Sequence, residues 1–269
     1  MADQRLDAAL AARGLARSRT HAATLITAGV VSVDGATVVK PSHRVPDDAL
    51  LEVAASDHYV SRAAHKLVAA LDGFGIDPAG RLALDAGAST GGFTQVLLER
   101  GAATVLAVDV GHGQLAPELV GAPGLELVEG CNVRNLDAAT LARLTGVDER
   151  PSLVTADLSF ISLTTVLPAL RATAVDDADF VLLVKPQFEV GRGGVREGVV
   201  RNAQLRSEAV MNVLWAAFDL GLGTAGVLSS PIAGGHGNLE YLVHLSAIGG
   251  SNPTEWSGRV DELAGGAHA

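Results

Sequence analysis

Lysine is nearly absent from this sequence, which holds only Lys40, Lys66 and Lys185 among 269 residues, against 17 arginines. Arginine keeps its charge under all ordinary conditions, whereas lysine can lose its proton. A retained lysine is therefore a candidate for a site that needs such an amine. Lys185 stands at the polar end of the apolar run 180–184, which is typical of a buried strand.

Cysteine and long apolar runs are also scarce. The single Cys131 excludes an internal disulfide framework and a cysteine-rich metal site. No stretch approaches the roughly 18 consecutive apolar residues of a membrane-spanning helix, and the first residues lack the apolar core of a signal peptide. We therefore expect a cytoplasmic enzyme with no metal and no membrane partner, while its oligomeric state stays open.

The acidic charge is unevenly distributed. The net charge is −10, which argues against indiscriminate binding to nucleic acid. Residues 1–57 contribute only −1 of it and the remainder −9, and the first nineteen residues carry Arg5, Arg13, Arg17 and Arg19. The N-terminal segment is therefore the candidate for contact with an anionic partner.

Residues 1–57 are predicted to form a small α+β domain. Leu6 and Leu10 share one face of a helix over 4–13, and Ser18 caps a second helix that ends before Gly29. Two β-rich runs flank Asp34-Gly35, which is a strong hairpin signal, and 50–53 supplies another strand. Residues 54–58 are the expected linker.

Residues 58–246 alternate between helices and short apolar strands, which predicts an α/β fold with a seven-stranded, mostly parallel, doubly wound sheet. A helix capped by Ser61 is expected over 61–72. The strands are expected near 82–86, 104–109, 125–129, 152–157, 179–185, 223–229 and 239–245, with helices near 92–100, 114–120, 137–145, 163–171 and 203–220. The tail 247–269 is predicted to be part helical or disordered.

A glycine-rich turn follows the first of these strands. In Asp85-Ala-Gly-Ala-Ser-Thr-Gly-Gly92, glycines allow close approach of a ligand to the backbone, yet the spacing fits neither the dinucleotide pattern nor a P-loop. Asp109 ends the next strand, where an acid can accept both hydroxyls of an adenosine ribose. The pattern resembles that of S-adenosylmethionine methyltransferases. This resemblance implies a cofactor site that includes Asp85, Gly87, Ser89, Gly91, Gly92, Asp109, Asn132 and Asp157, although Asn132 equally suits a plain turn.

Two further polar residues end neighbouring strands. Asp157 and Lys185 are expected at the carboxyl edge of the sheet, where open α/β sheets bind ligands. The segment Asp157-Leu-Ser-Phe160 lacks the Pro-Pro of enzymes that methylate base nitrogens, which disfavours that reaction. In chain order, Lys66, Asp157, Lys185 and Glu240 resemble the catalytic Lys-Asp-Lys-Glu tetrad of FtsJ-like ribose 2′-O-methyltransferases. Lys185 is then either a general base or a cation that stabilises the ribose oxygen.

The whole pattern resembles the TlyA family of ribosomal RNA 2′-O-methyltransferases, which are historically labelled hemolysins. Its N-terminal part is similar to the alpha-L RNA-binding motif. One departure is Asp57-His-Tyr-Val60, where family members carry Arg-x-Trp-Val. The matching phrases are Leu15-Ala-Arg-Ser-Arg19, Val31-Ser-Val-Asp-Gly35, Val60-Ser-Arg-Ala-Ala-His-Lys66, Asp109-Val-Gly-His-Gly-Gln-Leu115, Ala156-Asp-Leu-Ser-Phe-Ile-Ser162 and Val184-Lys-Pro-Gln-Phe-Glu189.

The resemblance implies a Rossmann-like enzyme that methylates cytidine riboses in the RNA of small and large ribosomal subunits. The residues expected to contact RNA are Arg5, Arg17, Arg19, Lys40 and Arg62. Three alternatives remain: a non-catalytic RNA-binding assembly factor, a methyltransferase acting on a small molecule or protein, and a membrane-lytic hemolysin. The absence of a spanning or long basic amphipathic segment disfavours the last.

Overall fold

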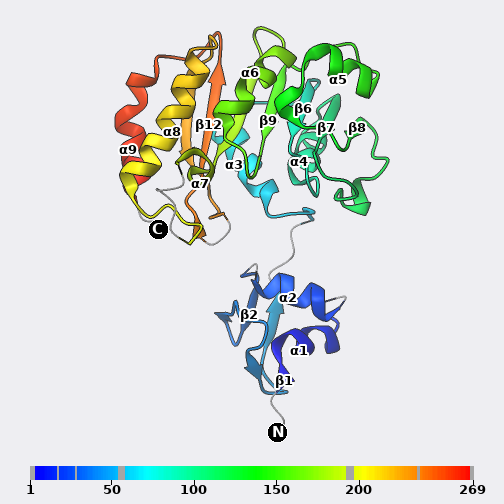
Figure 1. The fold of residues 1–269 in the computed structure, drawn as a ribbon. Coiled ribbons are helices and arrows are strands. Elements are labelled where there is room, and N and C mark those ends of the chain that lie inside the picture. Colours follow the sequence, from blue (N-terminus) through cyan, green and yellow to red (C-terminus); the bar gives the residue numbers. More distant parts are fainter. Residues whose placement is uncertain are drawn as a thin grey trace. The chain divides into compact units, whose positions relative to one another are not determined.

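The computed structural model describes residues 4–16, 18–27, 29–53, 58–191, 197–234 and 237–266. By its internal contacts the chain divides into two compact units, Met1–His58 and Tyr59–Ala269. Figure 1 shows a few short helices and strands in the first unit and a large sheet flanked by helices in the second. The two units are described separately.

The N-terminal unit has two helices, α1 (Leu6–Ala12) and α2 (Arg19–Thr27), over two small sheets. Leu6, Leu10 and Ile26 are fully buried in its core. Asp34 and Gly35 both have positive φ, as the tight hairpin between β2 and β3 requires. The strands are β1 (Gln4–Arg5), β2 (Val31–Val33), β3 (Ala36–Thr37), β4 (Arg44–Val45) and β5 (Leu51–Val53).

The predicted start of the first helix of this unit is wrong. The first helix begins at Leu6 instead of residue 4, because Gln4 and Arg5 pair as an extended strand with β4. Ser18 does accept a hydrogen bond from the backbone N–H of His21, as expected of a helix cap.

The larger unit is built on a seven-stranded sheet in the order β11-β12-β10-β9-β6-β7-β8. Neighbours from β10 through β8 run parallel, and β12 is antiparallel to both β10 and β11. The strands are β6 (Leu82–Ala86), β7 (Thr104–Val108), β8 (Leu125–Val128), β9 (Leu153–Ala156), β10 (Asp179–Val184), β11 (Gly223–Ser229) and β12 (Tyr241–Ser246). The predicted doubly wound sheet is confirmed.

Helices cover both faces of this sheet. Alternate side chains of each central strand enter separate cores: Leu182 packs on one face and Leu183 on the other. Helices α3 (Ala63–Phe74) and α4 (Gly92–Glu99) cover one face. The other is covered by α5 (Ala138–Thr145), α6 (Leu163–Thr173), α8 (Ala203–Phe218) and α9 (Ser257–Gly265).

Two predicted helices differ from those observed. Helix α3 begins at Ala63 without a side-chain cap, because Ser61 Oγ lies against the backbone at Gly92 instead of capping the helix. The helix expected over 114–120 is reduced to a single 3-10 turn at Pro117–Leu119, since Gly113 and Gly121 with positive φ bracket the segment.

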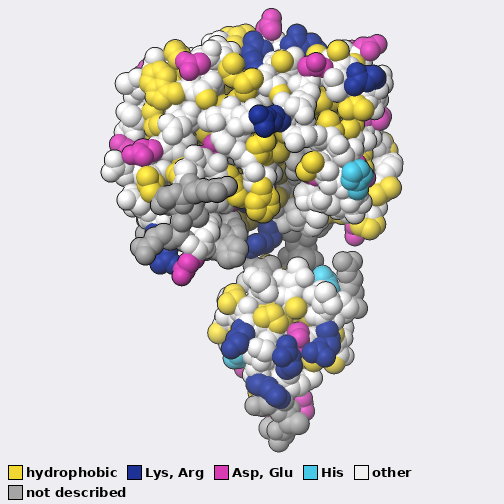
Figure 2. All heavy atoms as spheres, in the orientation of Figure 1, with side chains coloured by type: hydrophobic (Ala, Val, Ile, Leu, Met, Phe, Trp, Pro, Cys, Tyr) yellow, Lys and Arg dark blue, Asp and Glu magenta, His cyan; other side chains and the backbone are white. Residues whose placement is uncertain are grey.

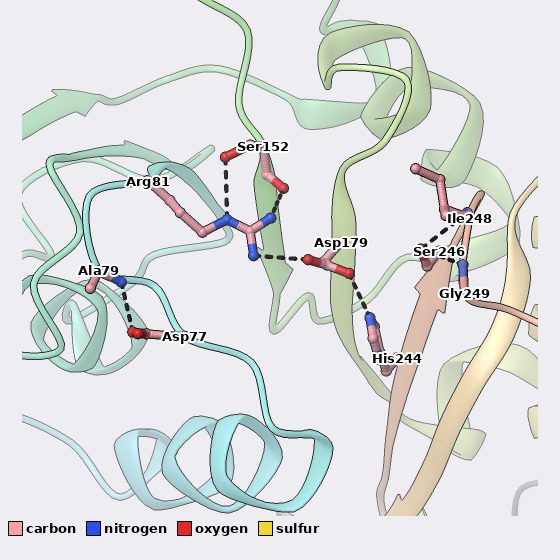
Figure 3. A network of polar contacts seen from close by, with 9 residues as sticks. All are labelled: Asp77, Ala79, Arg81, Ser152, Asp179, His244, Ser246, Ile248 and Gly249. Carbon is pink, nitrogen blue, oxygen red and sulfur yellow. Dashed lines mark hydrogen bonds and ion pairs between the residues drawn. The ribbon is translucent and has the colours of Figure 1, made fainter.

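A polar network holds the amino edge of the parallel strands (Figure 3). The Arg81 guanidinium donates to the carbonyl of Ser152 and, at 2.8 Å, to the Asp179 carboxylate. His244 Nε2 lies 2.8 Å from the other oxygen of Asp179. These residues stand at the starts of β6, β9 and β10 and on β12, so the network braces four strands at the edge opposite the predicted ligand edge.

Candidate active site

The four predicted catalytic side chains line one cavity of about 350 Å³, the first cavity. Asp157 and Lys185 directly follow the parallel strands β9 and β10. Glu240 precedes β12, which runs the other way and therefore starts at the same edge. Lys66 reaches this edge from α3. Residues separated by up to 174 positions in the chain thus meet at the carboxyl edge of the sheet.

The four side chains form two ion pairs. Lys66 Nζ lies 2.6 Å from Glu240 Oε2, and Lys185 Nζ lies 2.5 Å from Asp157 Oδ1. All four are largely buried. Taking such charges out of water is costly, and the cost is offset only while both partners are present. The first cavity therefore offers two amines held in place by carboxylates, next to open space for a substrate.

A second cavity of about 500 Å³ adjoins the first and is lined by Asp109, Asn132 and several apolar side chains. The two Asp109 carboxylate oxygens accept the backbone N–H groups of Ser89, at 2.8 Å, and Gly111, at 2.7 Å. Each oxygen keeps a lone pair that can accept a ligand hydroxyl. The cavity has the size of a pocket for a small molecule or cofactor.

The glycine-rich turn forms a wall common to both cavities. Gly87 has φ of 85°, and a Cβ there would lie 2.8 Å from Leu158 Cδ2 and 3.1 Å from the Asp157 carbonyl oxygen. A side chain would therefore clash with the loop that follows β9. Four residues line both cavities: Gly87, Ser89, Asp157 and Ser159.

Two predicted cofactor residues lie elsewhere. Asp85 is fully buried, lines neither cavity, and accepts a 2.6 Å hydrogen bond from Thr94 Oγ1. Burial raises the pKa of the Asp85 carboxyl to about 7, and Thr94 partly opposes this rise. Gly91 also lines neither cavity and is the residue before α4, at its N-cap, with φ of 92°. Both residues shape the turn from within. Gly92 lines the first cavity, not the second.

Sequence reasoning missed several residues of the site. Ser159 lines both cavities, and its Oγ accepts a 3.0 Å hydrogen bond from Lys185 Nζ. Phe160 is 91% exposed and has φ of 63°, a strained conformation for a large side chain. The motif Ala156–Ser162 contains both residues, but composition alone gave them no role. The other apolar residues of the second cavity are Val108, Val110, Val133, Leu158 and Ile161.

The predicted RNA-contacting arginines surround one acid in the N-terminal unit. The Asp7 carboxylate pairs with Arg5 at 3.0 Å and with Arg19 at 3.3 Å. These guanidiniums hold the pKa of Asp7 below its ordinary value, Arg5 contributing most. Figure 2 shows dark blue side chains around a magenta one on this unit. Arg17 lies outside the described residues.

Other basic residues of the prediction are placed separately. Lys40 is exposed, and Arg62 is exposed and lines the first cavity. Arg13 instead serves the fold, since its guanidinium donates to the backbone carbonyls of Pro46, Asp47 and Ala49.

The described ranges offer neither a membrane span nor a metal cluster. Among those residues, no helix combines the length and apolarity needed to cross a membrane. The same part of the chain contains no group of three or more His, Cys, Asp or Glu side chains that could hold a metal ion.

Two family profiles match this chain in succession. The S4 domain profile matches residues 4–50, and the FtsJ-like methyltransferase profile matches residues 59–247. The second match includes all four residues of the two ion pairs and both cavities.

Similar proteins match this chain over most of its length. The 16S/23S rRNA (cytidine-2′-O)-methyltransferase TlyA of Mycobacterium tuberculosis is 53% identical over 90% of this chain and 89% of its own. Hemolysin A of Brachyspira hyodysenteriae is 38% identical over 90% of this chain and 99% of its own. A hemolysin-named structure from Streptococcus thermophilus has a TM-score of 0.75 and 36% identity, and covers 98% of this chain and 95% of its own. The chain therefore belongs to the TlyA family of FtsJ-like methyltransferases with an N-terminal S4 domain.

Proposed function

We propose that this protein transfers the methyl group of S-adenosylmethionine to the 2′-hydroxyl of cytidines in ribosomal RNA, with small and large subunits as substrates. Two adjoining cavities support this proposal most strongly. One is lined by two lysine–carboxylate pairs and the other by Asp109. The substrate class comes from the TlyA enzyme to which the chain is 53% identical.

The second cavity fits the cofactor. Asp109 would accept the ribose hydroxyls of the adenosine, and the apolar side chains Val110 and Ile161 would contact the adenine. Gly87, Ser89 and Asp157, common to both cavities, would lie nearest the methionine part. When bound, the cofactor supplies an electrophilic methyl group on a sulfonium. Asn132 lies at the rim, although its side chain already caps the turn at Arg134.

The first cavity fits the target ribose. A ribose hydroxyl is a poor nucleophile, so its proton must be removed or its developing negative charge stabilised while the new O–C bond forms and the S–C bond breaks. Lys185 carries this role: it either accepts the proton or remains a cation beside the oxygen. Asp157 orients the Lys185 amine, and the Lys66–Glu240 pair supplies a second oriented ammonium. Arg62 would hold a phosphate of the RNA.

The N-terminal unit would capture the RNA. Arg5 and Arg19 expose their guanidiniums while sharing Asp7. Arg17 and Lys40 are the other basic residues of this sequence segment that we propose to contact RNA. Because the net charge is −10, binding should depend on this local cluster instead of on a general attraction to RNA.

The test is methyl transfer from tritiated S-adenosylmethionine to purified small and large ribosomal subunits. Digestion to nucleosides should place the label in 2′-O-methylcytidine, whose linkage resists alkaline hydrolysis. Lys185→Ala is the matched control and should give no label. Label in a base or a ribosomal protein, or no label on either subunit, would contradict the proposal.

A further inference from the structure

Ser159 touches Lys185 from the loop that follows β9. Its Oγ accepts a 3.0 Å hydrogen bond from Lys185 Nζ, which also contacts Asp157 Oδ1 at 2.5 Å. An ammonium has three donors; the hydrogen bond to Ser159 uses one of them, and the contact with Asp157 is an ion pair. The amine is thus fixed in direction by two residues of the same loop.

That loop is itself fixed at two further points. Phe160, directly after Ser159, has φ of 63° at a bend of the chain, and its exposed ring contacts Phe188, with ring centroids 5.2 Å apart. Glu189 accepts the Ser162 hydroxyl at 2.5 Å and the Leu163 N–H at 2.8 Å. Since Glu189 follows Lys185 by four residues, the segments after β9 and β10 are joined on both sides of Ser159.

The position of the Ser159 hydroxyl indicates its role in the reaction. Ser159 lines both cavities, so it stands where the proposed cofactor and target ribose meet. A carboxylate such as Asp157 only accepts hydrogen bonds, so it can accept an N–H of the amine but cannot donate to the lone pair of a deprotonated amine. A hydroxyl both donates and accepts, so it can hold a lysine side chain before and after that side chain gains or loses a proton.

We infer that Ser159 is a positioning residue of the methyl-transfer reaction, which aims the Lys185 amine at the ribose hydroxyl through the hydrogen bond between their side chains. This inference rests on the proposed function, which supplies the reaction. The hydrogen bond between Ser159 and Lys185 does not depend on that function. Ser159 acts through Lys185, and Glu189 keeps its loop in register.

The first readout is a single-turnover rate with saturating cofactor and ribosomal subunits. Ser159→Ala should lower this rate about 10- to 100-fold, because small misplacements of a reacting group have effects of this order. Ser159→Thr retains the hydroxyl and should recover most of the rate. Cofactor affinity by calorimetry should stay within about threefold of wild type in both. Ser257→Ala, which removes an exposed hydroxyl on α9, is the matched control.

The second readout is independent of activity. With only three lysines in the chain, the side-chain amine signals can be resolved by NMR and assigned with single Lys→Met variants. In Ser159→Ala the Lys185 amine protons should exchange faster with water, while the Lys40 and Lys66 signals stay unchanged. A wild-type protein that methylates no RNA overturns the proposed function, and the NMR comparison still decides the contact. An unchanged Lys185 signal, or a wild-type rate in Ser159→Ala, overturns the role of Ser159.

Discussion

The two units of this chain place their positive charges in opposite environments. In the N-terminal unit, Arg5 and Arg19 have side chains 43% and 60% exposed and share one acid. In the larger unit, the Lys66 and Lys185 side chains are only 10% and 11% exposed, each beside its own carboxylate. An exposed guanidinium keeps its charge and can bind phosphate, whereas a buried amine can be oriented and can exchange a proton. Under the proposed function, this difference separates RNA capture from chemistry.

The two units also differ in the pKa of a buried aspartate. Asp7 lies beside two guanidiniums, which lower its pKa, whereas Asp85 has hydroxyl partners in Thr94 and Thr155, and burial raises its pKa to about 7. The same residue type therefore makes the stability of the two units depend on pH with opposite signs.

The largest effect on methyl transfer is expected from replacing Lys185. Lys185→Ala should lower methyl transfer about 10²- to 10⁴-fold, as loss of a general base does, while cofactor binding measured by calorimetry is retained. Lys185→Arg should fail as well, because a guanidinium cannot accept a proton near neutral pH. Substantial activity in Lys185→Arg would exclude the general-base role and leave only the electrostatic one.

The next effect concerns the Lys66–Glu240 pair. Glu240→Gln should reduce the free energy of unfolding by about 3–5 kcal/mol, because it leaves the Lys66 ammonium buried without a carboxylate. Both tryptophans, Trp215 and Trp256, lie in the larger unit, so urea unfolding followed by fluorescence reports on that unit. The control is Lys66→Met combined with Glu240→Gln, which should recover most of the loss. Equal losses in the single and double variants would show that the unpaired Lys66 ammonium is not the cause of the loss.

Asp85→Asn should change the pH dependence of the larger unit. Between pH ~4, where an unfolded aspartate titrates, and pH 7, the native protein holds a proton on Asp85 that the unfolded chain has released. Wild-type stability should therefore fall as pH rises through this window. Asparagine cannot ionise, so the variant should be more stable at pH 8, by up to about 4 kcal/mol. Parallel pH curves for the two proteins would show that Asp85 does not cause the dependence.

Asp7→Asn should have the smallest effect, since its arginine partners are exposed. We expect a loss of about 1 kcal/mol or less, measured by hydrogen exchange of α1 and α2 amides. Because the pKa of Asp7 is lowered in the folded state, its contribution is present above pH ~4 and lost as pH falls below it. If the difference in stability between wild type and Asp7→Asn grew as the pH fell below about 4, the expected pH dependence would be contradicted.

The sequence predicted the sheet and the strand-end positions of Asp157 and Lys185 because both depend on local patterns, whereas the tetrad as a set rested on the resemblance to FtsJ-like enzymes. Strands end at polar residues such as Asp157 and Lys185, and parallel strands bring their ends together. It could not predict that Asp85 faces inward, because the direction of a strand-end side chain depends on packing against Thr94. Ser159 was missed for a similar reason: its hydrogen bond with Lys185 joins residues 26 positions apart, on loops whose course no local pattern predicts, and the next residue, Phe160, has a positive φ that its residue type rarely adopts.

The separation of capture from chemistry is tested most directly by Arg5→Gln combined with Arg19→Gln, which keeps hydrogen-bond donors for Asp7 while removing both charges. Single-turnover methyl transfer should be measured against ribosomal-subunit concentration over a series of salt concentrations. We expect a half-saturating concentration raised about tenfold or more at low salt, a flatter salt dependence, and an unchanged rate at saturation. A wild-type half-saturating concentration at every salt concentration, or a reduced rate at saturation, would contradict it.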